Sequence, residues 1–220
     1  MPLNRAAASP DLKRGLNPEL ERRAGWPRQK IAGVDEAGRG CWAGPVVAAA
    51  VILPESYVWD GLNDSKKLSA EQRAHLCACI QQDAATGLGI ATAAEIDASN
   101  ILVASLQAMA RAVAELAQTP DHILVDGNRL PDWSHSAEAV IGGDARAPSI
   151  AAASIIAKHT RDEMMVALEA QYPGYHWAQN KGYGVPAHRA GLAAQGLSPE
   201  HRRTFAPIRR LLKKKSGGLV

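Results

Sequence analysis

The segment from Ile31 to Leu53, IAGVDEAGRGCWAGPVVAAAVIL, constrains the fold more than any other part of the sequence. A short apolar run ends in two adjacent acids, Asp35 and Glu36, and the chain then passes through a glycine-rich turn into a second apolar run. Alanine and β-branched residues on both sides of such a turn predict two neighbouring strands in a largely buried sheet. Acids at the end of a buried strand are costly unless positive charge meets them, and a divalent cation would supply it.

The composition is that of an ordinary globular protein of 220 residues, with 46% hydrophobic and 21% charged residues. A chain of this length can form one domain without a disulfide or a structural metal. Its three cysteines form no CxxC pair, and we expect them to be small core residues in a reducing compartment. No apolar run reaches the ~20 residues of a membrane span, and no signal-peptide pattern is present. We therefore expect a cytoplasmic, monomeric protein that does not associate with membranes.

Positive charge is concentrated at the C-terminal end. Residues 196–220 contain seven arginines or lysines and one glutamate, which gives +6 against a total of +3, so the remainder sums to −3. A basic C-terminal segment on a mildly acidic protein is typical of proteins that bind a polyanion. A solvated tail would have the same composition, and the charge alone does not distinguish the two.

Turn signals and hydrophobic periodicity predict alternating strands and helices after an N-terminal arm. Ser69 to Gln72 form a capping-box pattern, and Leu102, Met109 and Val113 belong to an apolar helical stripe. This pattern favours a mixed sheet flanked by helices. The expected strands lie at 30–35, 45–53, 87–93, 122–127 and 139–141, and the expected helices at 18–24, 69–85, 100–117, 149–171, 187–194 and 205–212.

Three predicted strands end in acids, namely Asp35 with Glu36, then Asp126, and then Asp144. Ligands of α/β sheets collect at the carboxyl ends of strands, so these acids would converge, with no base adjacent in sequence to pair them. Repulsion would raise their pKa values, and hard cations such as Mg²⁺ prefer all-oxygen sites. Two such ions about 4 Å apart can activate a water and stabilise the leaving oxygen in phosphoryl transfer. Each acid taken alone could instead be an N-cap or turn carboxylate.

The adjacent positions of Asp35 and Glu36 raise a geometric difficulty. Neighbouring residues of a regular strand point to opposite faces, so both acids cannot face one site from such a strand. We therefore expect Glu36 to lie where the strand already turns.

Other chemistries lack their sequence patterns. The seven histidines are scattered, and neither HExxH nor a paired Cys/His spacing for zinc occurs. The chain also has no GxxxxGK[ST] phosphate-binding loop and no GxSxG nucleophile elbow.

Six motifs, in order along the chain, resemble those of bacterial ribonuclease HII, a type 2 ribonuclease H. They are DEAGRG at 35–40, LNDSKKL at 62–68, LVDGN at 124–128, GD at 143–144, IAAASIIAK at 150–158 and KGYG at 181–184. The resemblance covers about residues 31–205. It implies an RNase H-like α/β fold, a five-stranded mixed sheet flanked by helices, with a helical C-terminal part.

On this basis we divide the chain into three parts. Residues 1–29 are expected to form a flexible N-terminal extension, residues 30–195 the RNase H-like catalytic domain, and residues 196–220 a basic helical segment and tail. The resemblance implies cleavage of the RNA strand of RNA–DNA hybrids. It also implies nicking of duplex DNA 5′ of a single embedded ribonucleotide, with 5′-phosphate and 3′-hydroxyl products.

The resemblance also implies roles for particular residues. Four acids correspond to the metal-binding and catalytic set of the family, with Mg²⁺ or Mn²⁺ as the ion: Asp35, Glu36, Asp126 and Asp144. The loop Gly38-Arg39-Gly40 corresponds to the element that reads the ribose 2′-hydroxyl, for which glycines allow a close backbone approach. Tyr183 corresponds to the aromatic that packs on the neighbouring deoxyribose, and Lys66 to a phosphate-contacting lysine.

The sequence departs from the family pattern outside the acids, at Cys41, Trp42, Gly142, His159, Asn180 and Val185. Two alternatives remain at this point. One is another RNase H-fold nuclease, such as a DNA-cutting relative or ribonuclease HIII, although the latter generally carries an N-terminal substrate-binding domain too large for residues 1–29. The other is a non-catalytic hybrid-binding module, which would be expected to have lost at least one acid.

Overall fold

The computed structural model describes residues 16–57 and 61–216, without the side chains of 213–216. Its five-stranded mixed sheet has the order β3-β2-β1-β4-β5. β2 pairs antiparallel with both β1 and β3, while β4 and β5 run parallel to β1. The predicted mixed sheet is confirmed, and its strands are β1 (Ile31–Ala37), β2 (Val46–Ile52), β3 (Ala85–Ala91), β4 (His122–Asp126) and β5 (Ala137–Val140).

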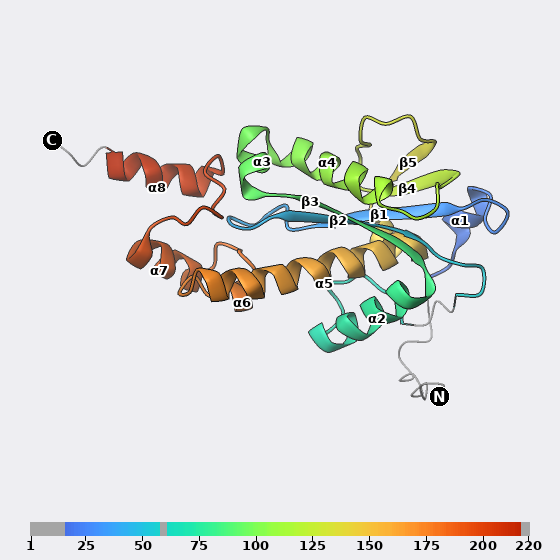
Figure 1. The fold of residues 1–220 in the computed structure, drawn as a ribbon, viewed down its shortest axis with the longest axis horizontal. Coiled ribbons are helices and arrows are strands. Elements are labelled where there is room, and N and C mark those ends of the chain that lie inside the picture. The colour runs from blue at the N-terminus through green and yellow to red at the C-terminus, as the bar shows by residue number, and fades with distance from the viewer. Residues whose placement is uncertain (1–15, 58–60, 217–220) are drawn as a thin grey trace.

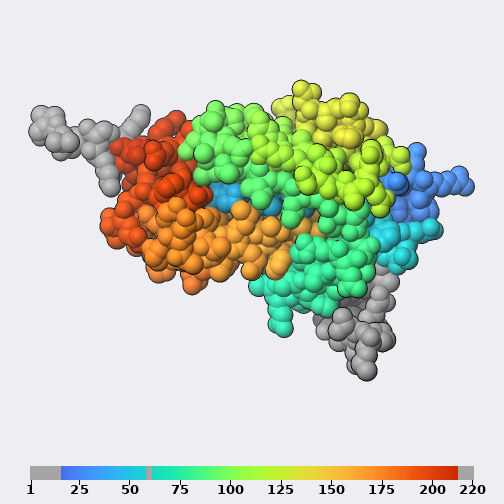
Figure 2. Space-filling model, in the orientation of Figure 1, coloured from blue at the N-terminus to red at the C-terminus, as the bar shows by residue number. Residues whose placement is uncertain are grey.

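Helices cover both faces of the sheet, which is seen nearly edge-on in Figure 1. On one face lie α3 (Ala93–Ala98) and α4 (Ile101–Ala114), and on the other α2 (Ala70–Asp83) and α5 (Pro148–Gln171). In Figure 2 blue is visible in a narrow strip between green α3–α4 and orange α5, where the first strands lie. All residues of β2 are buried, because alternate side chains enter the two cores that these layers enclose.

The helix α4 differs in one respect from the predicted apolar stripe. Its cap is Asn100, whose side chain accepts from two backbone amides, and Met109 and Val113 are buried as expected. Leu102, however, is 38% exposed, and the face against the sheet consists mainly of alanines. The reason is close packing, since a side chain at Gly89 of β3 would overlap the backbone of α4.

Both ends of the described chain pack onto this domain. The predicted short helix forms as α1 (Glu19–Arg23), and Leu20 contacts the core beside Ile31. Residues 1–15, part of the expected extension, lie outside the described residues. After α5 come α6 (Trp177–Asn180), α7 (Pro186–Gln195) and α8 (Ala206–Ser216), which confirms the two predicted C-terminal helices. Among the described helices, none has the length and apolarity needed to cross a bilayer.

The contact between β1 and α5 depends on Gly33. A Cβ at this position would overlap the backbone of Ser149 and Ile150, so the helix lies directly on the strand that carries the first two acids. We expect Gly33→Ala to lower the free energy of unfolding by about 2–4 kcal/mol through overpacking. Urea unfolding of Gly33→Ala measures this loss.

Gly40→Ala is the matched control for Gly33→Ala. A Cβ at Gly40 would make only an ordinary contact, 3.7 Å from the Tyr183 ring. Its loss of stability should be below about 1 kcal/mol. Equal losses in the two variants would contradict the close-packing argument.

Candidate active site

The predicted acids of β1 and β4 lie side by side at the centre of the sheet. Parallel pairing of the two strands ends at Val34 and Val125, so Asp35 and Asp126 are the next residues on neighbouring strands. Asp35 is buried, and Asp126 is partly exposed. The topology therefore brings together two acids that are far apart in sequence, as predicted.

Asp144 joins them through a short 3₁₀ helix, η2 (Gly143–Ala145), which follows β5. The Gly143 amide donates to Asp126 Oδ1 at 2.7 Å, and this bond links the start of η2 to the end of β4. A side chain at Gly143 would collide with Ile150. A larger residue before Asp144 would therefore have to displace the tip of Ile150, whereas the backbone bond to Asp126 itself needs no glycine.

Glu36 does not lie in a turn, and this expectation was wrong. β1 continues to Ala37 because β2 still pairs with it there, although β4 has already ended. The Glu36 side chain is nevertheless only 9% exposed. Burial raises the pKa of both Asp35 and Glu36, and the charge of Asp126 raises both further, so the two acids share one electrostatic environment.

The cluster is electrostatically strained. Burial raises the pKa of Asp35 well above its usual range, and the charges of Glu36, Asp126 and Asp144 add to the effect. Burial also raises the pKa of Asp126, as does the Asp144 charge, while the bond from Gly143 opposes them. These carboxylates therefore favour binding a proton or a cation.

Two bases approach the cluster from elsewhere in the chain. Arg39 Nη1 lies 3.2 Å from Glu36 Oε1, and Lys66 Nζ lies 3.7 Å from Asp144 Oδ2. The Lys66 side chain is 76% exposed, so this pair is largely solvated and contributes little to stability. The acids are thus only partly neutralised by protein groups.

The donor set suits a hard divalent cation, because it consists only of carboxylate oxygens. In this conformation, no three His, Cys, Asp or Glu side chains within the described parts of the chain are arranged to hold one metal ion. The acids bond to protein groups instead. Asp35 accepts from the Glu36 amide, Asp126 from Gly143, and Asp144 pairs with Lys66.

The glycine-rich loop and Tyr183 also meet, as the substrate assignment requires. Tyr183 is 47% exposed and lies beside Gly40, and the Trp42 amide donates to the Gly182 carbonyl at 2.8 Å. Two departures from the family pattern support this junction. The Trp42 ring packs against Gly184, and Asn180 accepts from the Gly182 amide and donates to the Tyr175 carbonyl.

Two buried arginines lie behind the loop that are not among the site residues predicted from the sequence. Arg161 of α5 donates to the carbonyls of Ala43, Pro45 and Lys181, and Arg202 to those of Arg39, Gly44 and Pro45. Gly38 has φ +101°, and a Cβ there would overlap Arg161. Burial lowers the pKa of Arg202 to about 10, so its charge is present at neutral pH. Arg202 is therefore not part of a basic surface, in contrast to our count of the C-terminal charges.

The position of Lys66 depends on a third buried arginine. Arg73 of α2 donates to the carbonyls of Ser65 and Leu68, on either side of Lys66, and pairs with Asp162 at 3.3 Å. Ser154 of α5 donates to the Ser65 hydroxyl at 2.7 Å. The exposed lysine thus stands on a fixed loop.

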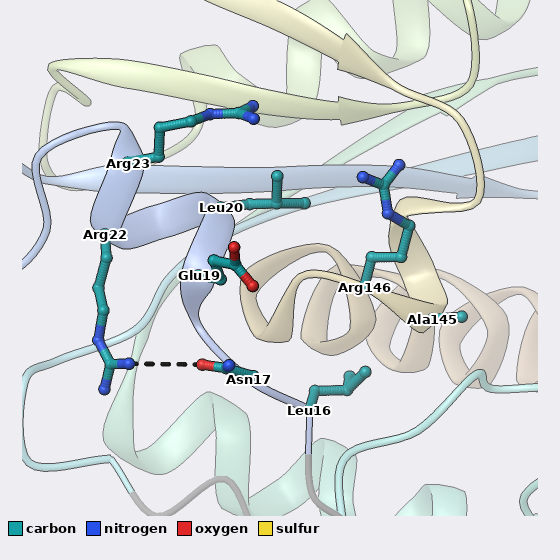
Figure 3. Close-up of a pocket in the computed structure, with 8 residues that line it drawn as sticks. All are labelled: Leu16, Asn17, Glu19, Leu20, Arg22, Arg23, Ala145 and Arg146. Carbon is teal, nitrogen blue, oxygen red and sulfur yellow. Dashed lines mark hydrogen bonds between the residues drawn. The ribbon is translucent and has the colours of Figure 1, made fainter.

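The structure also has a pocket of about 840 Å³ between α1 and η2 (Figure 3). Arg22, Arg23 and Arg146 line it, and Arg22 donates to Asn17 while Arg23 pairs with Glu138. None of the predicted site residues lines this pocket. Lys66 and Tyr183 stand exposed, so the candidate site is approached from an open surface.

The sequence matches a family of known proteins. The sequence profile of the family "Ribonuclease HII" matches residues 32–208. A ribonuclease HII of Rhizorhabdus wittichii is 60% identical over 178 residues, which cover 81% of this chain and 88% of that protein. The ribonuclease HII of Paracoccus denitrificans is 54% identical, over 84% of this chain and 88% of its own length.

Solved structures agree. The ribonuclease H2 of Pyrococcus horikoshii OT3 superimposes with a TM-score of 0.73 at 27% identity, over 84% of this chain and 98% of that chain. A Bst-RNase HIII in complex with Mn²⁺ has a TM-score of 0.67 at 18% identity, over 90% of this chain and 74% of that one, which shows the shared fold. The RNase H-like fold is thereby confirmed. This chain belongs to the ribonuclease HII family and is an endoribonuclease of the ribonuclease H type.

Proposed function

We propose that Asp35, Glu36, Asp126 and Asp144 form the catalytic centre and hold divalent cations, Mg²⁺ or Mn²⁺. The observation that carries this proposal is the meeting of four incompletely neutralised carboxylates, from the last residues of β1, the end of β4 and the short helix η2. When bound, such ions activate a water for attack on phosphorus and stabilise the leaving 3′-oxygen. The relative solved with Mn²⁺ supports this choice of ion only through its fold.

The two bases would change partners when the site is loaded. Arg39 and Lys66 hold Glu36 and Asp144 in the present conformation. A bound cation would take over these carboxylates and leave the exposed Lys66 to contact a backbone phosphate. Such a contact fixes the register of a duplex without reading its sequence.

We assign substrate discrimination to the Gly38-Arg39-Gly40 loop and Tyr183. The loop would approach the ribose at its 2′-hydroxyl, and the Tyr183 ring would pack on the deoxyribose that follows. The buried arginines Arg161 and Arg202 support this assignment, because they fix the loop before substrate binds. The substrates are RNA–DNA hybrids and duplex DNA with single ribonucleotides, nicked on the 5′ side.

We also propose that the chain acts as a cytoplasmic monomer. Two of its three free cysteines, Cys41 and Cys77, are buried, which suits a reducing compartment. Light scattering at micromolar concentration checks the monomer, and a stable dimer would contradict it. Cell fractionation checks the compartment.

Asp126→Asn tests the catalytic centre. The substitution removes a ligand charge but keeps an oxygen that can accept from Gly143, so the protein should fold and kcat should fall by about 10³-fold or more. Cleavage of a hybrid duplex in Mg²⁺ measures the effect, with the exposed loop acid Asp132→Asn as control. Wild-type turnover by Asp126→Asn would contradict the assignment.

Asp35→Asn tests the electrostatic strain. The folded-state pKa of Asp35 is raised by burial, so the charged group costs stability above that pKa, and the cost disappears as pH falls toward the unfolded value. In EDTA at pH 7, Asp35→Asn should raise Tm by roughly 2–4 °C for each kcal/mol relieved, and the gain should shrink in acid.

Added Mg²⁺ should reverse the order of the two Tm values, so that the wild type becomes more stable than Asp35→Asn. The ion should raise the Tm of the wild type more than that of Asp35→Asn, because it binds only the folded site. If Asp35→Asn were less stable than the wild type in EDTA at pH 7, the proposed electrostatic strain on Asp35 would be contradicted.

Lys66→Ala tests the phosphate contact. Loss of one contact should weaken binding at low salt and reduce the slope of log K against log salt by about 0.9. Lys67→Ala is the matched control, because it removes the same charge from the adjacent exposed position of the loop. Equal effects of the two substitutions would mean that the loop contributes only diffuse charge.

A further inference from the structure

Two buried histidines without a role in the proposed chemistry connect Tyr183 to the segment after Gly40. His188 lies on α7 and is fully buried, and His201 is 1% exposed. Their Nε2 atoms are 3.0 Å apart. At this distance one nitrogen must carry a hydrogen and the other must not, and the surrounding donors determine which.

The proton on His201 is fixed by Ser198. The Ser198 amide lies 3.0 Å and its hydroxyl 2.9 Å from His201 Nδ1; the hydroxyl can donate or accept, but the amide N–H can only donate. Nδ1 is therefore the acceptor, and the neutral ring carries its hydrogen on Nε2. His201 thus donates to His188 Nε2.

The proton on His188 is fixed by Trp177. The indole Nε1–H is also only a donor, and it lies 3.1 Å from the same His188 Nε2. His188 Nε2 consequently accepts from two donors, and the neutral ring carries its hydrogen on Nδ1. Nδ1 lies 3.0 Å from the Tyr183 carbonyl oxygen, so His188 donates to the backbone of Tyr183.

The other end of this chain of hydrogen bonds reaches the loop segment. His201 forms an antiparallel β-bridge with Ala43, which consists of two main-chain bonds between the flanking residues. The Gly44 amide donates to the Glu200 carbonyl, and the Arg202 amide donates to the Trp42 carbonyl, each at 2.9 Å. Tyr183 and the residues after Gly40 are thus joined through two buried rings, and both hydrogen bonds along this path are donated toward the Tyr183 carbonyl.

We propose that His188 is a positioning residue for discrimination between sugars. Its Nδ1–H holds the backbone of Tyr183, and its bond to His201 fixes the position of Tyr183 relative to the loop that approaches the preceding ribose. This spacing keeps the Tyr183 ring on a deoxyribose while the loop holds the ribose. The inference rests on the proposed role of Tyr183.

Two substitutions separate the functions of the ring nitrogens. The amide oxygen of His188→Gln can take the Nε2 position and accept from Trp177 and His201, but the donor to Tyr183 is lost. The amide nitrogen of His188→Asn can take the Nδ1 position and keep that donor, while the Nε2 acceptor is lost. A purely structural role for His188 would make both variants lose activity equally on every substrate.

The measurement is kcat/KM on two substrates, a DNA duplex with one ribonucleotide and a continuous RNA–DNA hybrid. In His188→Gln the ratio of the two values should fall by about tenfold, because displacement of a positioning group lowers the rate for the substrate it orients. In His188→Asn, which keeps the donor to Tyr183 but loses the link to His201, the ratio should fall less than in His188→Gln. Tyr183→Ala should lower the ratio as well, and combination with His188→Gln should add little, because both changes remove one interaction.

Equal losses on both substrates in His188→Gln, or full additivity with Tyr183→Ala, would overturn the positioning role. No change of the ratio in Tyr183→Ala alone would instead overturn the proposed role of Tyr183. A second test uses the wild-type protein and so does not depend on the stability of a variant. The ring ¹⁵N resonances should show His188 protonated at Nδ1 and His201 at Nε2, and a His188 ring protonated at Nε2 would overturn the contact with Tyr183.

Discussion

Repulsion among four carboxylates at the end of a buried sheet is the constraint on which the rest of the site depends. Asp35 is buried beside the charges of Glu36, Asp126 and Asp144, and its pKa is raised for both reasons. A fold that served stability alone would replace these acids by apolar residues. The surrounding structure instead holds them in place, through pairing of β1 with β2 beyond the end of β4 and through the bond from Gly143 to Asp126.

The elements around the acids are held by buried cations that bind carbonyl oxygens. Arg161 and Arg202 fix the segment from Arg39 to Pro45, and Arg73 fixes the loop of Lys66. A guanidinium group can satisfy several carbonyls at once, which makes it suitable for fixing loops that have no regular hydrogen-bond pattern. The result is a preformed surface in which acids, loop and Tyr183 have set relative positions before substrate arrives.

The sequence was sufficient for the sheet and for the convergence of the acids. It was insufficient where burial depends on tertiary packing. Arg202 counts as one more basic residue near the C-terminus, yet it is buried under the glycine-rich loop. Arg161 did leave a signal, since it lies four residues from both Ala157 and Met165, which are buried on the same face of α5. Glu36 was placed in a turn because strand pairing on one side only cannot be derived from alternation.

The most direct test of this account is cleavage of a DNA duplex that carries one ribonucleotide, beside an all-DNA duplex, first with Mg²⁺ and then with EDTA. We expect a single nick on the 5′ side of the ribonucleotide in Mg²⁺, none in EDTA, and an intact all-DNA control. Nicking that persists in EDTA would contradict the role of the four acids as a metal site. Cleavage of the all-DNA duplex would contradict the reading of the 2′-hydroxyl by the loop and Tyr183.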